Sequence, residues 1–152
     1  MRRENSDFVT KFVTSAGDFE VNKDYFAYIE LDDYACWVLA DGLDSATEKL
    51  SSEIVVNSIL SDFSEDPSLK KRKIKKYIRQ ANQRLREESR TMSLQSTVLV
   101  VVSDYHFVRW GYVGNTRLYH LRKEKIRSCT TDHSIAQMML EVGDISKQQL
   151  NQ

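Results

Sequence analysis

The sequence predicts an α+β fold built on an antiparallel β-sheet. Strand patterns and helix patterns are grouped along the chain: strands come first, two helices follow, and a second run of strands leads to a short helix. Aromatic and branched residues on both sides of Asp32-Asp33 form a hairpin signal, which makes the first strands antiparallel. This order differs from the regular strand-helix alternation of a doubly wound parallel sheet.

Seven segments have strand character, at residues 8–13, 25–31, 35–40, 98–102, 107–113, 117–121 and 125–129. Two of them are apolar almost without interruption, 35–40 and 98–102, and we expect both to be buried on two faces. The pattern over 98–102 is the purest, so this strand is expected at the centre of the sheet. The last three segments continue as a meander.

Helical periodicity predicts three helices, over residues 46–63, 68–88 and 134–142. The first two each carry one apolar stripe, formed by Leu50, Ile54, Val55, Ile59, Leu60 and Phe63 and by Leu69, Ile74, Tyr77, Ile78, Ala81 and Leu85. Asp66 followed by Pro67 indicates the start of the second helix, with Asp66 as its cap. Gly143 is the expected C-cap of the third helix.

Length and composition predict one cytoplasmic domain over residues 1–152. Basic and acidic residues balance at 22 each, so we expect no nucleic acid partner. The basic run on the second helix, from Lys70 to Arg86, suits a phosphate-rich partner or, as we prefer, a solvated helix face. Cys36 and Cys129 are too few for a disulfide scaffold or a zinc site. No signal peptide or long apolar run is present, so no membrane partner is expected.

Asp41-Gly42 follows directly after a buried strand. A carboxylate at such a position is costly unless something compensates its charge. A divalent cation does so, and carboxylate and carbonyl oxygens suit Mg²⁺ or Mn²⁺, while the glycine lets the backbone approach the ion closely. The alternative is an ordinary Asp-Gly turn, which the two residues alone would favour.

Four segments together resemble the N-terminal part of the protein phosphatase 2C family, the metal-dependent Ser/Thr phosphatases. In chain order they are Arg2-Arg3-Glu4-Asn5-Ser6-Asp7, Ala40-Asp41-Gly42, Gly114-Asn115-Thr116-Arg117 and Thr130-Thr131-Asp132-His133-Ser134. The resemblance implies a sandwich of antiparallel sheets flanked by helices. It also implies hydrolysis of phosphoserine or phosphothreonine with Mg or Mn as cofactor, and a phosphoprotein substrate or a kinase as partner.

The resemblance also implies roles for individual residues. Arg2 matches an arginine that binds the substrate phosphate, which suits its planar fork. Asp41 matches the aspartate that bridges two metals, and Gly42 lends its carbonyl. Asp7 and Asn115 match residues that support the metal shell. For the last motif we expect Asp132 to cap the following helix and no direct catalytic role for His133.

Several residues depart from the family pattern. Ser6 stands where an acid or amide is usual, Ala46 stands where the bacterial branch has a histidine, and Asn115 replaces an aspartate. The chain given also stops at Gln152, before the family's C-terminal aspartates. We therefore expect a phosphatase 2C-like domain that is inactive as this fragment. The alternatives are a pseudophosphatase that binds a phosphoprotein or kinase, and an unrelated interaction module.

A partial sandwich has a consequence for association. Strands that are apolar on both faces need cover, and sheet edges invite pairing with another copy. We therefore expect an exposed apolar patch or self-association, with a homodimer as the simplest outcome.

Overall fold

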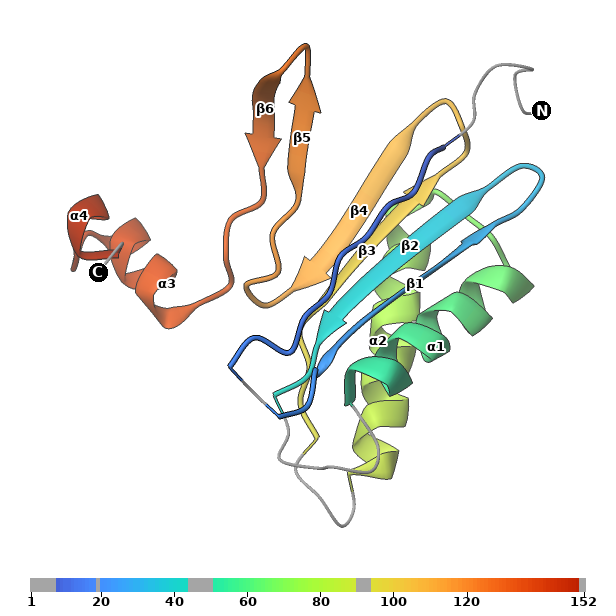
Figure 1. Cartoon of the computed structure of the whole chain (residues 1–152), viewed down its shortest axis with the longest axis horizontal. Helices are drawn as coiled ribbons and strands as arrows, with labels where there is room; N and C mark the ends of the chain where they lie inside the picture. Colours follow the sequence, from blue (N-terminus) through green and yellow to red (C-terminus); the bar gives the residue numbers. More distant parts are fainter. Residues whose placement is uncertain (1–7, 19, 44–50, 90–93, 151–152) are drawn as a thin grey trace. The chain divides into compact units, whose positions relative to one another are not determined.

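The structure is a computed structural model that describes residues 8–18, 20–43, 51–89 and 94–150. The chain forms two compact units, Met1–Tyr112 and Val113–Gln152, and each is described by itself. The first unit holds a four-stranded sheet and two helices, and the second holds a β-hairpin and two short helices (Figure 1). This is the α+β class with antiparallel pairing that the sequence predicts.

Four strands form the larger sheet in the order β1-β2-β3-β4: β1 (Asp24–Glu30), β2 (Ala35–Asp41), β3 (Val98–Ser103) and β4 (Val108–Val113). β2 pairs antiparallel with both β1 and β3, so that Val38 lies between Ala27 and Val100. The turn between β1 and β2 is centred on Asp32-Asp33, as the hairpin signal predicts. β3 lies between two neighbours, which confirms the central place expected for residues 98–102.

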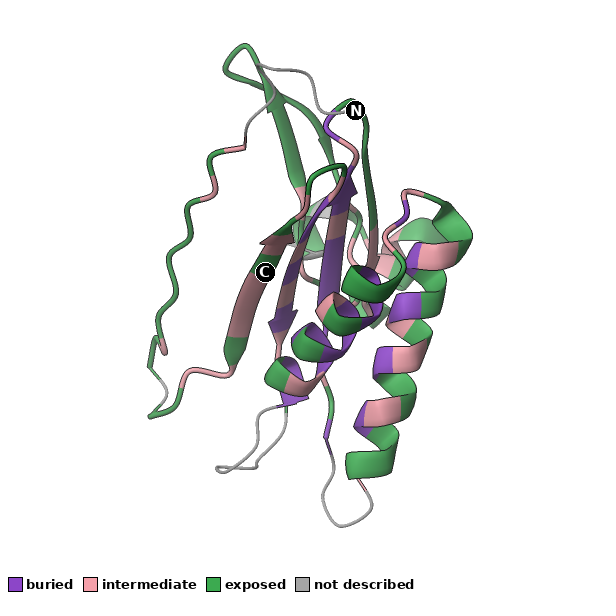
Figure 2. Ribbon diagram, turned by 90° about the vertical axis from the view of Figure 1, so that its right-hand side faces the viewer, coloured by how far each residue is buried: buried purple, intermediate pink, exposed green. Residues whose placement is uncertain are grey.

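Helices α1 (Ser51–Glu65) and α2 (Lys71–Glu88) cover one face of this sheet, and the buried residues gather between them and the strands (Figure 2). The core contains Cys36, Val38 and Ala40 of β2, Val98, Val100 and Val102 of β3, Val56, Ile59 and Phe63 of α1, and Ile74, Tyr77, Ala81 and Leu85 of α2. Both predicted helical stripes therefore face the core, except Leu50, which lies outside the described residues.

The predicted start of α2 is wrong. The N-cap is Lys70, which makes no capping bond through its side chain, and the helix begins at Lys71. Asp66 is engaged elsewhere, because its carboxylate pairs with the Lys73 ammonium and its backbone carbonyl accepts the Tyr77 hydroxyl. These contacts fix the segment before α2 in a non-helical path.

Residues 8–13 form no strand, which corrects another prediction. They run as an extended segment whose side chains contact the sheet face opposite the helices. The ring of Phe8 lies 4.7 Å from that of Trp37, and Phe12 lies 5.3 Å from Phe26, measured between ring centroids. The Trp37 indole also donates to the Thr10 hydroxyl at 2.8 Å. Side-chain contacts thus hold a segment whose apolar residues had indicated a strand.

The smaller unit contains the hairpin strands β5 (Tyr119–Arg122) and β6 (Lys125–Cys129), then α3 (Ile135–Val142) and α4 (Lys147–Leu150). Gly143 is the C-cap of α3 with a φ of 86°, as predicted. The N-cap is Ser134, whose hydroxyl accepts from the Gln137 amide, so the expectation that Asp132 caps this helix is wrong. None of the helices in the described ranges is long and apolar enough to cross a membrane.

Candidate functional site

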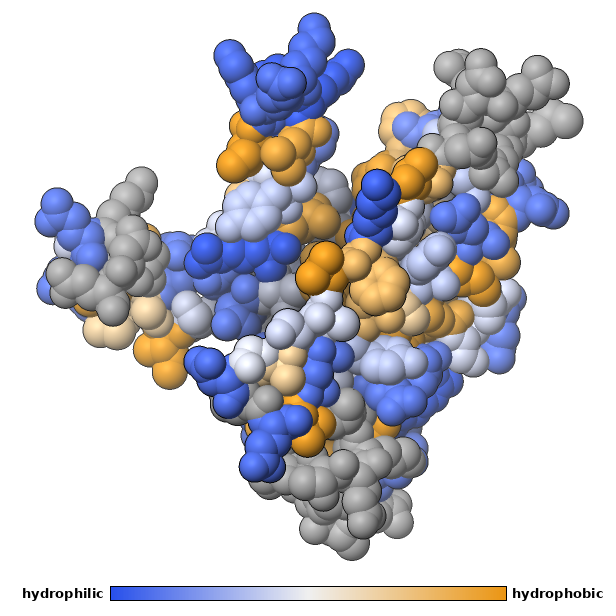
Figure 3. Space-filling view, in the orientation of Figure 1, coloured by the Kyte–Doolittle hydropathy of each residue, from blue (hydrophilic) through white to orange (hydrophobic). Residues whose placement is uncertain are grey.

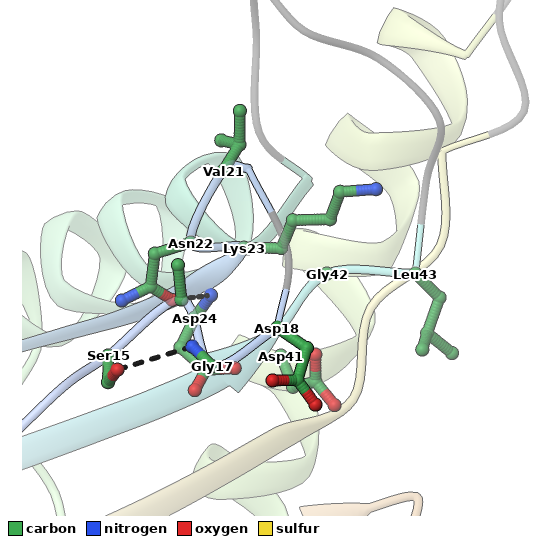
Figure 4. Close-up of a pocket in the computed structure, with 11 residues that line it drawn as sticks. Ser15, Gly17, Asp18, Val21, Asn22, Lys23, Asp24, Asp41, Gly42 and Leu43 are labelled. Atoms are coloured by element: carbon green, nitrogen blue, oxygen red, sulfur yellow. Dashed lines mark hydrogen bonds between the residues drawn. The ribbon is translucent and has the colours of Figure 1, made fainter.

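A pocket of about 680 Å³ lies beside the end of β2 (Figure 4). Its wall is formed by the loop before β1, by the first residue of β1, and by the last residue of β2 with the two residues that follow. The lining residues are Ser15, Ala16, Gly17, Asp18, Val21, Asn22, Lys23, Asp24, Asp41, Gly42 and Leu43. The predicted metal residues Asp41 and Gly42 therefore both border a cavity.

The strand register brings two carboxyl groups together in this pocket. Asp24, the first residue of β1, is the direct partner of Asp41, the last residue of β2. Burial raises the pKa of the Asp41 carboxyl, and the charge of Asp24 and a hydrogen bond to its side chain raise it further. Two touching carboxyl groups are stable only if they share a proton or a cation compensates their charge.

Two buried serines hold the backbone at this corner. The Lys23 carbonyl accepts the Gly42 amide at 3.0 Å and the Ser52 hydroxyl at 2.5 Å. The Gln95 carbonyl accepts the Leu43 amide at 2.9 Å and the Ser51 hydroxyl at 2.6 Å. Both hydroxyls come from the first turn of α1, so the helix is tied to the two segments that flank Gly42 and Leu43.

The donor set at the corner is small. Asp18 lines the same pocket, yet the described part of the chain contains no group of three or more His, Cys, Asp or Glu side chains able to hold a metal ion. Asp24 and Asp41 remain as a pair, with the Gly42 peptide beside them. One or two carboxylates, with water in the other positions, are the usual protein ligands of Mg²⁺. The pair therefore fits a hydrated Mg²⁺ or Mn²⁺ ion.

The other predicted site residues are Arg2, Asp7 and Asn115. Arg2 and Asp7 lie outside the described residues, as do Ser6 and Ala46. Asn115 is exposed and belongs to the smaller unit.

Within the smaller unit the last two family-like motifs bind each other. The Arg117 guanidinium donates to both carboxylate oxygens of Asp132, at 2.8 and 2.7 Å. The Gly114 carbonyl accepts the His133 amide at 2.9 Å. The arginine holds the pKa of the Asp132 carboxyl below its ordinary value. Asp132 thus fixes the turn that carries Asn115 and does not cap α3.

Sequence reasoning missed Asp24, Ser51 and Ser52. Asp24 had a usable signal, because residues paired in the hairpin are equally distant from the Asp32-Asp33 turn, and counting outward from the turn places Asp24 opposite Asp41. The sequence contains no comparable signal for Ser51 and Ser52, because their hydrogen-bond partners are 44 and 29 residues away in the chain.

The sequence and the fold match one class of proteins. A family model described as protein phosphatase 2C matches residues 16–144, and the chain belongs to this family. No curated protein sequence matches it.

Solved structures of bacterial serine/threonine phosphatases are similar to this chain. The phosphatase of S. agalactiae matches with a TM-score of 0.74 at 19% identity, covering 86% of this chain and 57% of that one. Stp1 of Staphylococcus aureus matches with a TM-score of 0.72 at 19% identity, covering 91% and 59%. The PstP catalytic domain in complex with two manganese ions matches with a TM-score of 0.66 at 18% identity, covering 86% and 58%. The chain thus spans less than two thirds of the length of these relatives.

Proposed function

We propose that this chain supplies the metal-binding corner of a Mg²⁺- or Mn²⁺-dependent protein Ser/Thr phosphatase. The observation that carries the proposal is the direct pairing of Asp24 with Asp41 on neighbouring strands, where both residues line one pocket of a phosphatase 2C family chain. A structurally similar PstP catalytic domain binds two manganese ions, which supports a divalent cation here. The two free cysteines, Cys36 and Cys129, suit the reducing cytoplasm we propose as its compartment.

The proposed substrate is a protein phosphorylated on serine or threonine. Water attacks phosphorus, the bond from phosphorus to the serine or threonine oxygen breaks, and the products are the alcohol and inorganic phosphate. A divalent cation, when bound, activates water for this attack. Asp41, Asp24 and the Gly42 carbonyl would hold the cation, Arg2 would bind the substrate phosphate, and Asp7 and Asn115 would support the metal shell.

Residues 1–152 alone provide a weak version of this site. In the described ranges no group of three or more His, Cys, Asp or Glu side chains able to hold a metal ion is present at the corner. Asn115 offers a neutral amide, which binds hard cations less tightly than a carboxylate. We therefore expect cation binding without turnover. The second candidate function, a pseudophosphatase that binds a phosphoprotein or kinase, is favoured by the same amide.

The test is a calorimetric titration with Mn²⁺ followed by a hydrolysis assay with p-nitrophenyl phosphate. We expect Mn²⁺ to bind the unaltered chain and to bind at least tenfold more weakly to Asp41→Asn and Asp24→Asn, because each substitution removes one negative ligand. Hydrolysis should not exceed that of the buffer.

Asp32→Asn is the matched control, since Asp32 is an exposed carboxylate on the same hairpin. Equal Mn²⁺ affinity in all four proteins would contradict the metal site. Metal-dependent turnover that disappears in Asp41→Ala would support the phosphatase but overturn the expected inactivity.

A further inference from the structure

The β5–β6 hairpin carries a cationic pocket of about 380 Å³. Four side chains line it, His120 and Arg122 from β5, Lys123 from the turn and Arg127 from β6. All four are exposed, and the tip of this hairpin is the hydrophilic group at the top of Figure 3. The pocket shares no residue with the Asp41 pocket.

Arg127 lies at a β-bulge in the β5–β6 hairpin. Leu121 pairs with Ile126, whereas His120 pairs with Ser128, so Arg127 is an extra residue in β6. Side chains alternate between the two faces of a strand, which separates the Leu121–Ile126 pair from His120 and Arg122. Arg127, the extra residue, lines the same pocket as His120 and Arg122.

The turn of the hairpin is built from two residues in the left-handed region. Lys123 has a φ of 52° and Glu124 a φ of 60°. Such two-residue turns favour Asn-Gly, because side chains other than those of Asn, Asp and Gly are strained there. A lysine in this place adds strain to the turn and adds a charge to the pocket.

The positive charge of the hairpin is not neutralised locally. Between His120 and Cys129 the chain has four Lys or Arg residues and a single acid, Glu124, which does not line the pocket. Among the residues that the structure describes, none of the four lining side chains forms an ion pair. The pocket can therefore bind an anion without breaking an existing ion pair.

We propose that this pocket is a docking site for a phosphorylated segment of a protein. The guanidinium groups of Arg122 and Arg127 match a phosphate in shape and charge, and Lys123 adds a third cation. A protein partner is favoured over nucleic acid because the whole chain has no net charge and the pocket has no Phe, Tyr or Trp for base stacking. The choice of a phosphoprotein rests on the proposed function.

The experiment uses fluorescence anisotropy with a labelled Gly/Ala peptide that contains two phosphoserines, at low salt and with EDTA. We expect the unaltered chain to bind it at least tenfold more tightly than the unphosphorylated peptide. Arg122→Ala/Arg127→Ala should lose at least tenfold in affinity, because charge-assisted bonds to phosphate are lost. Arg122→Lys/Arg127→Lys should fall between the two.

Two matched variants test whether the peptide binds the hairpin pocket. Lys75→Ala/Arg79→Ala removes two exposed cations from α2 and should change the peptide affinity less than twofold. A loss equal to that of the pocket variant would show diffuse electrostatic attraction and would overturn the docking site.

Asp41→Asn tests the proposed metal site and should leave peptide binding unchanged, so that failure of one proposal is separable from failure of the other. Loss of peptide binding in Asp41→Asn would overturn the assignment to the hairpin pocket. A single-stranded oligonucleotide that binds as tightly and with the same dependence on Arg122 and Arg127 would overturn the phosphoprotein assignment.

Discussion

Two adjacent serines connect the scaffold to the candidate metal corner. Ser51 and Ser52 are both fully buried at the start of α1, and each donates to a carbonyl that also accepts a backbone amide from Gly42 or Leu43. A buried hydroxyl is costly without a partner, so these bonds set where the helix begins relative to the corner. The position of Asp41 therefore depends on residues that do not touch its carboxylate.

Removing these hydroxyls should destabilise the chain. We expect Ser51→Ala/Ser52→Ala to lower the free energy of unfolding by about 2 kcal/mol, since a typical buried hydrogen bond contributes roughly 1 kcal/mol. Urea denaturation followed by circular dichroism measures this value. Ser64→Ala is the control, because the Ser64 hydroxyl bonds Ser61 on the exposed side of the same helix. An effect as small as that of Ser64→Ala would show that the corner is held without the two hydroxyls.

At the scale of elements, α2 lies very close to β4 at Gly111. A Cβ built on Gly111 would lie 2.8 Å from Ile74 Cγ2 and 3.2 Å from Ile78 Cδ1. Ile74 is only 3% exposed and its branch is rigid, so it has little room to move. Glycine is therefore required here by packing, although its backbone angles are ordinary.

Gly111→Ala should cost about 1–3 kcal/mol of stability, the usual range for overpacking a core. Thermal and urea unfolding measure this cost. Ile74→Ala removes the opposing methyl group, so the cost of Gly111→Ala should shrink in that background, which is a coupling that a double-mutant cycle detects. If the two substitutions prove additive, the close approach of α2 to β4 is not what selects glycine.

At the scale of the whole molecule, the larger unit has one covered and one open sheet face. Within this unit the helices cover the first face, whereas the extended segment 8–13 crosses the second. Tyr28, Val108 and Trp110 remain 46%, 49% and 43% exposed. Apolar surface is visible on this side of the sheet in Figure 3. Such a face invites a partner, and a second copy is the simplest one.

We expect the chain to self-associate at micromolar concentration through this face. Analytical ultracentrifugation should show a dimer that Val108→Glu/Trp110→Glu shifts to monomer, because burying the new charges is costly. Lys75→Glu, on the exposed side of α2, is the control and should leave the dimer intact. A monomer at high concentration that also binds no dye for apolar surface would contradict the inference.

The sequence alone determined the fold class, most strands and the helical stripes, because alternation and 3.6-residue periodicity are local properties. It failed where a side chain had a choice of partners. Asp66 forms an ion pair with Lys73, and Asp132 forms one with Arg117. Neither aspartate caps the helix that it was expected to cap. Residues 8–13 have the apolar content of a strand, yet aromatic contacts hold them across the sheet outside its ladder.

The sequence also predicted a cation site at Asp41-Gly42, from its position after a buried strand and its match to the phosphatase 2C family. Only the tertiary structure decided what surrounds it. Asp24 reaches Asp41 through strand register, and Ser51 and Ser52 reach the corner through the docking of α1 on the sheet. Those neighbours are distant in the chain, and no local pattern encodes a contact that forms only when separate elements pack together.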